Sequence, residues 1–381
     1  MTPAWLLPEY IEDILPPYAR AAESLRRRLL DLFDSYGYDL ITPPLVEYLD
    51  SLLTGAARDL DLKTFKVMDG LSGRMMGVRA DMTPQAARID AHLLNRKGPT
   101  RLCYAGPVLL TKPAGMLARR EPLQIGAELF GHHGIEADIE IQSLLIAALR
   151  VAGVPEIRLN LSHVGLFQAM VKDSALAPEY AGQLAEAMRQ KDVPEIAAIT
   201  ATLDAPWRNA FLALPELYGG REALDRAMQV LPDVNEILRA LDDLTRLYDM
   251  AEGMQVGIDL SDVRGDGYHN GVVMAAYAGG QARAVALGGR YDGAGAVFGR
   301  SRAATGFSLD LRQILDCLEV PVARTGIRAP HSCDQELQAK IAALRAAGER
   351  VVVELPGHVN TQHESDCDRQ LVLDGSNWIV H

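Results

Sequence analysis

The segment PLQIGAELFG, residues 122–131, alternates apolar residues with polar or small ones between a proline and a glycine. This period of two predicts a β-strand with Gln124, Gly126 and Glu128 on one face. Gln124 and Glu128 lie at most about 13 Å apart along a strand that rises ~3.3 Å per residue. A glycine inside a strand often marks the close approach of a ligand or another backbone, although a polar face is also typical of a strand that meets water. The segment therefore predicts either a small polar binding site or an ordinary solvated face.

The composition is that of a globular protein. The chain has 381 residues, of which 48% are hydrophobic and 23% charged, and its net charge is −12. This length is typical of two or three domains. The acidic balance argues against broad contact with a nucleic-acid backbone. No apolar run is long enough to span a membrane, and the first residues lack the basic and apolar regions of a signal peptide.

The cysteines show no paired spacing, which is typical of a reduced cytoplasmic protein. They are Cys103, Cys317, Cys333 and Cys367. The segment HVNTQHESDCD at 358–368 gathers histidine, cysteine and aspartate, but its spacing matches no closed tetrahedral metal site. We expect a solvated loop there, and neither a metal nor a cofactor in this protein.

Helix and strand signals divide the chain into a larger N-terminal domain, 1–325, and a small α/β appendage, 326–381. Between about 165 and 252 the composition shifts to Ala, Leu, Glu and Arg, which predicts a helical insertion. Elsewhere in the first domain we expect helices at 18–36 and 136–152, and strands within 63–84, 101–111, 122–131, 256–261, 270–277 and 282–288. The pattern predicts an α+β fold with an antiparallel sheet.

The segment RADMTPQAAR, residues 79–88, predicts the start of a helix. Thr83 is a suitable N-cap and Pro84 a suitable first helical residue. Asp81 therefore lies just ahead of a helix N-terminus.

The order of the motifs GPVLL, QIGAELFG, VRGDGYHNG, GGRYDG and GFSLDLRQI resembles the catalytic domain of class II histidyl-tRNA synthetases over residues 5–320. The resemblance implies an antiparallel sheet flanked by helices and a histidine pocket, with GGRYDG at its floor. By their places in the matching motifs, the pocket residues are Asp81, Thr83, Gln124, Glu128, Arg264, Tyr268 and His269. His269 stands where the synthetases usually have a second tyrosine.

The chemistry of these residues suits a zwitterion. Asp81, Thr83 and Gln124 can accept hydrogen bonds from an α-ammonium group, and Glu128 can accept one from an imidazole N–H. Arg264 can pair with an α-carboxylate. The room beside Gly126 is then the room for the ligand. The alternative to a ligand site is a buried polar network whose residues hydrogen-bond only to one another.

The parts that would handle nucleotide and tRNA depart from the synthetase pattern. Leu110 stands where the synthetases have an arginine on the α-phosphate, and Gln313 stands where they have a second nucleotide-binding arginine. Arg312 is adjacent, but one residue along a helix turns a side chain by about 100°. Fewer than sixty residues follow position 325, whereas an anticodon-binding domain has ~100.

A histidine pocket without ATP or tRNA handling resembles the family of ATP phosphoribosyltransferase regulatory subunits, which are synthetase paralogues. The resemblance implies a noncatalytic sensor of L-histidine that joins a short catalytic subunit at the first step of histidine biosynthesis, and a homodimer through 18–44. One alternative is a divergent synthetase or amide-forming adenylate enzyme, which would exchange pyrophosphate with ATP. A tRNA-binding module is another, which the acidic chain disfavours.

Overall fold

The computed structural model describes residues 5–53, 59–113, 115, 118–251, 253–264, 267–319, 325–357 and 367–381. The chain forms two compact units, Met1–Asp13 with Ala22–Glu319, and Ile14–Ala21 with Val320–His381. Each unit contains its own sheet and its own hydrophobic core.

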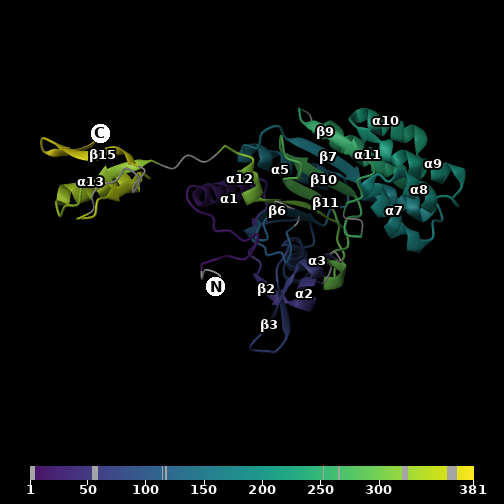
Figure 1. Cartoon of the computed structure of the whole chain (residues 1–381), viewed down its shortest axis with the longest axis horizontal. Helices are drawn as coiled ribbons and strands as arrows, with labels where there is room; N and C mark the ends of the chain where they lie inside the picture. The colour runs from purple at the N-terminus through teal and green to yellow at the C-terminus, as the bar shows by residue number, and fades with distance from the viewer. Residues whose placement is uncertain are drawn as a thin grey trace. The chain divides into compact units, whose positions relative to one another are not determined.

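The first unit is built on a sheet of nine strands in the order β1-β5-β6-β12-β11-β10-β7-β9-β8 (Figure 1). Within the described residues, β1–β5 and β7–β9 are parallel and the other neighbours are antiparallel. The strands are β1 Asp39–Leu40, β5 Thr100–Pro107, β6 Leu123–Phe130, β7 Arg158–His163, β8 Tyr218–Gly219, β9 Gln255–Asp259, β10 Val272–Tyr277, β11 Ala286–Arg290 and β12 Ala304–Asp310. The predicted α+β fold with a mainly antiparallel sheet is confirmed.

Two long helices, α1 (Tyr18–Ser35) and α5 (Glu136–Ala152), cover one face of this sheet. Phe33 of α1 meets Phe307 of β12 edge to face, with ring centroids 5.9 Å apart. α5 packs on β6, β11 and β12. α5 ends at Gly153, whose φ of 84° is a left-handed C-cap that glycine adopts without strain.

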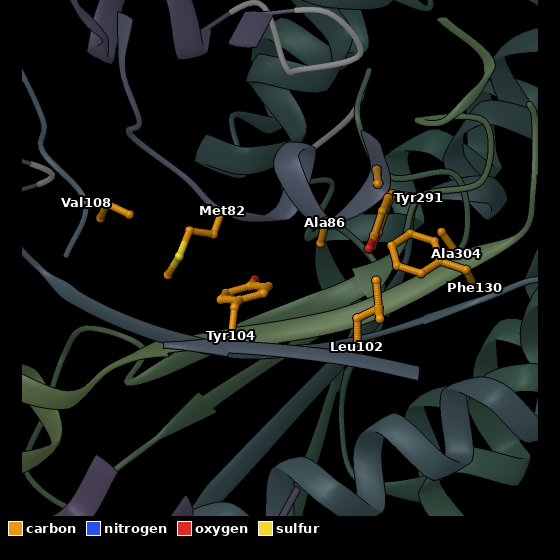
Figure 2. Packing of buried hydrophobic residues seen from close by; sticks show 9 residues of the cluster. Met82, Ala86, Leu102, Tyr104, Val108, Phe130, Tyr291 and Ala304 are labelled. Atoms are coloured by element: carbon orange, nitrogen blue, oxygen red, sulfur yellow. The ribbon is translucent and has the colours of Figure 1, made fainter. Parts of the chain in front are cut away.

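The opposite face carries α4 (Thr83–Arg88), which continues as the π-helix η1 (Ile89–Leu94). The helix packs its apolar side on β5 and β6 through a buried cluster (Figure 2). Its members are Met82, Ala86, Ala87, Leu102, Tyr104, Val108, Phe130, Tyr291 and Ala304. The first turn of α4 is therefore fixed directly over the strand that contains Gln124 and Glu128.

The predicted N-cap of α4 is wrong. Met82 holds the N-cap position and makes no side-chain cap. The Thr83 hydroxyl instead lies 3.0 Å from the Glu128 carboxylate. The carboxylate of Asp81 accepts the hydrogen bond from the Thr83 amide at 3.0 Å. The Thr83 hydroxyl therefore binds a buried acceptor on the sheet, and the carboxylate of Asp81, just before the N-cap, binds the first amide of the helix.

A second, three-stranded antiparallel sheet leads into α4. It has the order β2-β4-β3, with β2 Val46–Tyr48, β4 Met75–Val78 and β3 Phe65–Met68. The helix α2 Leu49–Leu53 packs on β2 and β4, and an ion pair between Asp61 and Lys66 joins α3 Asp59–Lys63 to β3. A Cβ at Gly77 would lie 2.7 Å from a methyl of Leu52 and 2.8 Å from the methyl of Thr64, so a larger residue there would displace both side chains. β4 ends one residue before Arg79, and the sheet thereby places Asp81 and Thr83.

Helices form most of the chain between β7 and β9. They are α6 Val164–Asp173, α7 Pro178–Gln190, α8 Val193–Ile199, α9 Ala205–Ala213, the 3-10 turn η2 Leu214–Glu216, α10 Arg221–Val230 and α11 Asn235–Met250. The short strand β8 lies among them and pairs with β9 at the sheet edge. The short helices η3 Ala296–Phe298 and α12 Leu311–Asp316 flank β12.

The second unit has a four-stranded sheet, in the order β14-β13-β15-β16, and one helix. The elements are β13 Gly326–Ala329, α13 Gln335–Ala346, β14 Val351–Val353, β15 Cys367–Asp374 and β16 Asn377–Val380. Ile327, Leu337, Ile341 and Leu371 form its core. No described helix in either unit has the length and apolar character needed to cross a membrane.

Candidate functional site

Asp81 and Gln124 are bound to each other at the start of α4. The Gln124 amide donates to Asp81 Oδ1 at 2.7 Å, and its carbonyl oxygen accepts from the Met82 amide at 2.9 Å. These bonds fix both side chains between the helix and β6. The pair presents carboxylate and carboxamide oxygens together, a combination suited to an ammonium group.

Glu128 is buried on β6 among three hydroxyl groups. Its Oε1 accepts from Tyr104 at 2.8 Å and from Thr83 at 3.0 Å, and its Oε2 accepts from Tyr291. Burial raises the pKa of this carboxyl to about 8, although the three hydroxyls oppose the shift. A neutral acid surrounded by hydroxyls can exchange hydrogen bonds with an uncharged ring.

The raised pKa of Glu128 predicts a pH-dependent stability. Between about pH 4.5, the ordinary value, and about pH 8, the folded chain holds a proton that the unfolded chain has lost. The free energy of unfolding should therefore fall as pH rises through this window, by up to ~1.4 kcal/mol per pH unit. Urea unfolding of the wild type and of Glu128→Gln at several pH values measures this, because the variant lacks the titrating group. Parallel stability profiles would contradict the assignment.

Two glycines shape the surroundings of Glu128, and one expectation about them is wrong. A Cβ at Gly126 would lie 2.6 Å from the Tyr104 hydroxyl and 2.7 Å from Cζ of the same ring, so Tyr104 and not a ligand fills that room. Tyr104 lies directly opposite Gly126 in the pairing of β5 with β6. A Cβ at Gly306 of β12 would lie 1.7 Å from Glu128 Oε2. Gly306 is thus the residue that makes room for the carboxylate.

Tyr268 and His269 form an aromatic wall beside this network. The Tyr268 ring stacks on Tyr291 with centroids 5.3 Å apart, and it meets the His269 ring edge to face at 5.1 Å. The Tyr268 hydroxyl and His269 Nδ1 are buried and have no hydrogen-bond partner among the described residues. Burial lowers the pKa of His269 to about 4, so its ring is neutral near pH 7. Unpaired buried polar atoms are costly, and a bound polar molecule would satisfy them.

Arg264 reaches the same region from the loop after β9. It lines a cavity of about 560 Å³, as do Asp81 and Gln124. This volume lies within the range of small-molecule sites. Thr83, Glu128, Tyr268 and His269 are not in the cavity lining, but hydrogen bonds and ring contacts connect them to one another through Tyr291 and Glu128. The structure therefore places three predicted residues at the cavity and the other four in an adjoining buried network.

Sequence reasoning missed the two tyrosines that bind Glu128. Tyr291 belongs to GGRYDG, which was expected at the pocket floor without a role for its phenol. Tyr104 gave no local signal, because its relation to Glu128 depends on strand pairing. Burial raises the pKa values of both phenols well above their ordinary value, so both remain hydrogen-bond donors.

The two positions where the synthetases have nucleotide-binding arginines carry neutral side chains in this chain. Leu110 and Gln313 line the cavity, whereas Arg312 does not. Arg312 is buried and pairs with Glu12 at 3.3 Å. Gln313 accepts a hydrogen bond from Arg283 at 2.8 Å and donates one to the Ala284 carbonyl at 3.0 Å. Neither position offers a cation to phosphate.

Among the described residues, no group of three or more His, Cys, Asp or Glu side chains could hold a metal ion. His358, His363 and Asp366 lie outside the described residues. The four cysteines are free.

Comparison with known proteins identifies the class first. Residues 10–314 match the family profile described as histidyl-tRNA synthetase. A histidyl-tRNA synthetase from Nostoc sp. has the same fold, with a TM-score of 0.79 and 16% identity over 97% of this chain and 91% of its own. The sheet, the helix α4 and the site together define a protein of the class II histidyl-tRNA synthetase fold.

The particular family follows from the whole chain, which belongs to the ATP phosphoribosyltransferase regulatory subunits. The protein of that name from Ralstonia nicotianae is 54% identical over 99% of this chain and 98% of its own, and that from Cupriavidus taiwanensis is 54% identical over 100% and 99%. Residues 324–381 match the profile described as the ATP phosphoribosyltransferase subunit HisZ C-terminal domain. A crystal structure described as an ATP phosphoribosyltransferase regulatory subunit/histidyl-tRNA synthetase, from Bacillus halodurans, is 28% identical over 96% of this chain and 97% of its own, with a TM-score of 0.85.

Proposed function

We propose that this chain is a noncatalytic regulatory subunit that binds L-histidine and uses it to control ATP phosphoribosyltransferase, the first step of histidine biosynthesis. It works with a separate short catalytic subunit in the cytoplasm, and two copies pair through the 18–44 region. The observation that supports this proposal best is the common cavity of Asp81, Gln124 and Arg264. Acceptors and a guanidinium on one cavity suit the two charges of an amino acid.

The buried network supplies the recognition of the side chain. Glu128 would accept from the imidazole N–H, with Thr83 beside it. Tyr268 would offer its unpaired hydroxyl, and its ring and that of His269 would pack on the imidazole. Because Glu128 is a neutral acid below about pH 8 and its partners are hydroxyl groups, a neutral ring fits this network better than an ammonium or guanidinium side chain.

Catalysis of adenylate formation is not expected of this cavity. A single arginine that stabilises charge on a transferred phosphoryl group contributes on the order of a thousandfold or more. Leu110 and Gln313 supply no such charge. The catalytic subunit would carry the phosphoribosyl chemistry, and this chain would carry the sensor.

Binding and exchange assays on the isolated chain test the proposal. L-histidine should bind in isothermal titration calorimetry, and histidine-dependent exchange of pyrophosphate with ATP should stay at background. Restoring both arginines, Leu110→Arg with Gln313→Arg, should improve ATP binding before any chemistry appears, because positioning depends on more than two groups. Exchange by the unmodified chain would favour the adenylate enzyme. Retention of tRNA at physiological salt, with no binding of histidine, would favour the tRNA-binding module.

A further inference from the structure

Arg264 is held along one edge of its guanidinium group. Asp262 accepts from Arg264 Nε at 2.8 Å through Oδ1 and at 2.9 Å through Oδ2, and it also contacts Nη2. Asp262 Oδ1 accepts the Arg264 backbone amide as well, at 3.2 Å. The Tyr277 hydroxyl of β10 accepts from Nη2 at 3.0 Å. Three of the five guanidinium N–H bonds are thereby occupied by the protein.

The other edge of the Arg264 guanidinium group, at Nη1, has no partner among the described residues. Arg264 lines the cavity with Asp81 and Gln124, whereas Asp262 and Tyr277 do not. Within the described residues, Arg264 Nη1 forms no hydrogen bond or ion pair. The side chain is 43% exposed, and the Asp262 side chain is only 14% exposed. A partly exposed arginine without such partners would sample many rotamers, and ordering it would reduce the net gain from a new contact.

Both partners are themselves fixed. The Ser162 hydroxyl of β7 donates to the Asp262 carbonyl oxygen at 2.7 Å, which anchors the loop to the sheet. The guanidinium carbon of Arg158 lies over the Tyr277 ring, 5.2 Å from its centroid. The support for Arg264 therefore comes from two strands of the main sheet and does not depend on the loop alone.

We propose that Asp262 and Tyr277 are positioning residues for the amino-acid ligand. They hold the Nε and Nη2 edge of Arg264, so that both Nη1 N–H bonds remain for the ligand α-carboxylate. The inference rests on the proposed function, because it assumes an amino acid in the cavity. It assigns a role to two residues that do not reach the ligand and that motif comparison did not single out.

A pair of ligands separates this role from a general effect on folding. L-histidine carries the α-carboxylate and histamine lacks it, while the two share an amino group and an imidazole. Calorimetry should show that Asp262→Asn weakens binding of L-histidine by about tenfold, the lower end of the effect seen when outer partners of metal-binding groups are removed. Binding of histamine should change less than twofold. Tyr277→Phe should have a smaller effect in the same direction.

Asp249→Asn is the matched control, since Asp249 also pairs with an arginine, Arg221, but on the helical segment away from the cavity. It should change neither affinity. Unchanged binding of L-histidine by Asp262→Asn, equal weakening of both ligands, or tighter binding of L-histidine would each overturn the inference. Tighter binding would mean that Asp262 competes with the ligand for Arg264. Failure of the wild type to bind L-histidine would instead refute the proposed function.

Discussion

Arg264→Ala should relieve the inhibition of the reconstituted ATP phosphoribosyltransferase by histidine while leaving the complex assembled. Arg264 lines the cavity together with Asp81 and Gln124, and its loss would leave the ligand α-carboxylate without the proposed partner. Truncation of one partner of a buried charge pair typically costs ~2–5 kcal/mol. Because Arg264 is partly exposed, we expect the lower end of this range, which raises the inhibitory concentration by roughly thirtyfold. The side chain is 43% exposed, and its removal should leave the core intact.

The size of the relief is limited by how strongly the effector site and the catalytic subunit are coupled. A ligand shifts an equilibrium only by its differential affinity for the two states. Typical coupling is ~1–3 kcal/mol, or about 5- to 150-fold. Because the catalytic subunit would carry the chemistry, the variant should retain the turnover of the uninhibited complex. In the wild type, the catalytic subunit should change the affinity for histidine by the same factor by which histidine changes the affinity for the catalytic subunit.

Turnover measured at increasing histidine gives the inhibitory concentration. Size-exclusion chromatography of the same samples shows whether the complex stays assembled. Arg221→Ala is the control, because its side chain is 45% exposed and its carboxylate partner lies on the helical segment. It should be inhibited like the wild type. Equal inhibition of Arg264→Ala would show that this cavity is not the regulatory site, and failure of the two subunits to associate would refute the proposed regulatory function itself.

Sequence periodicity predicted those helices and strands whose local residue pattern matches their place in the folded chain. The alternation in 122–131 predicted β6. The predicted helices at 18–36 and 136–152 end close to the ends of α1 and α5, where the chain continues into the left-handed glycines Gly37 and Gly153. The six-residue strand β7 and the four-residue strands β13 and β16 are among the elements that were not expected. Each is stabilised by pairing within its sheet that no local pattern reveals.

The candidate site shows the same division. Motif comparison identified the residues on β6, on α4 and in the 264–269 segment. It could not show that Tyr104 occupies the room at Gly126, because that contact depends on the register of β5 with β6. It also could not show that Asp262 holds Arg264, because acidic and basic residues two positions apart in a sequence usually form at most a solvated surface pair.

Gly306→Ala should destabilise the first unit and abolish binding of histidine. Gly306 lies directly opposite Glu128 in the pairing of β12 with β6. An added Cβ would lie 1.7 Å from Glu128 Oε2 and 2.7 Å from the Ala127 carbonyl oxygen. The carboxylate is buried and cannot move into water, so either it leaves its hydroxyl partners or the two strands separate. Overpacking of a core typically costs ~1–3 kcal/mol, and the lost bonds to a buried carboxyl add to this.

Thermal unfolding and calorimetry with L-histidine measure the two effects. Gly182→Ala in α7 is the matched control, because no atom lies within 4 Å of a Cβ there. A helical glycine replaced by alanine should gain ~0.5–1 kcal/mol, so the same chemical change should raise the Tm at one site and lower it at the other. In a Glu128→Ala background the carboxylate clash is absent and only the contact with the Ala127 carbonyl remains, so Gly306→Ala should cost less there than in the wild type. Equal costs in the two backgrounds would show that Gly306 does not make room for Glu128, since coupled neighbours must depart from additivity.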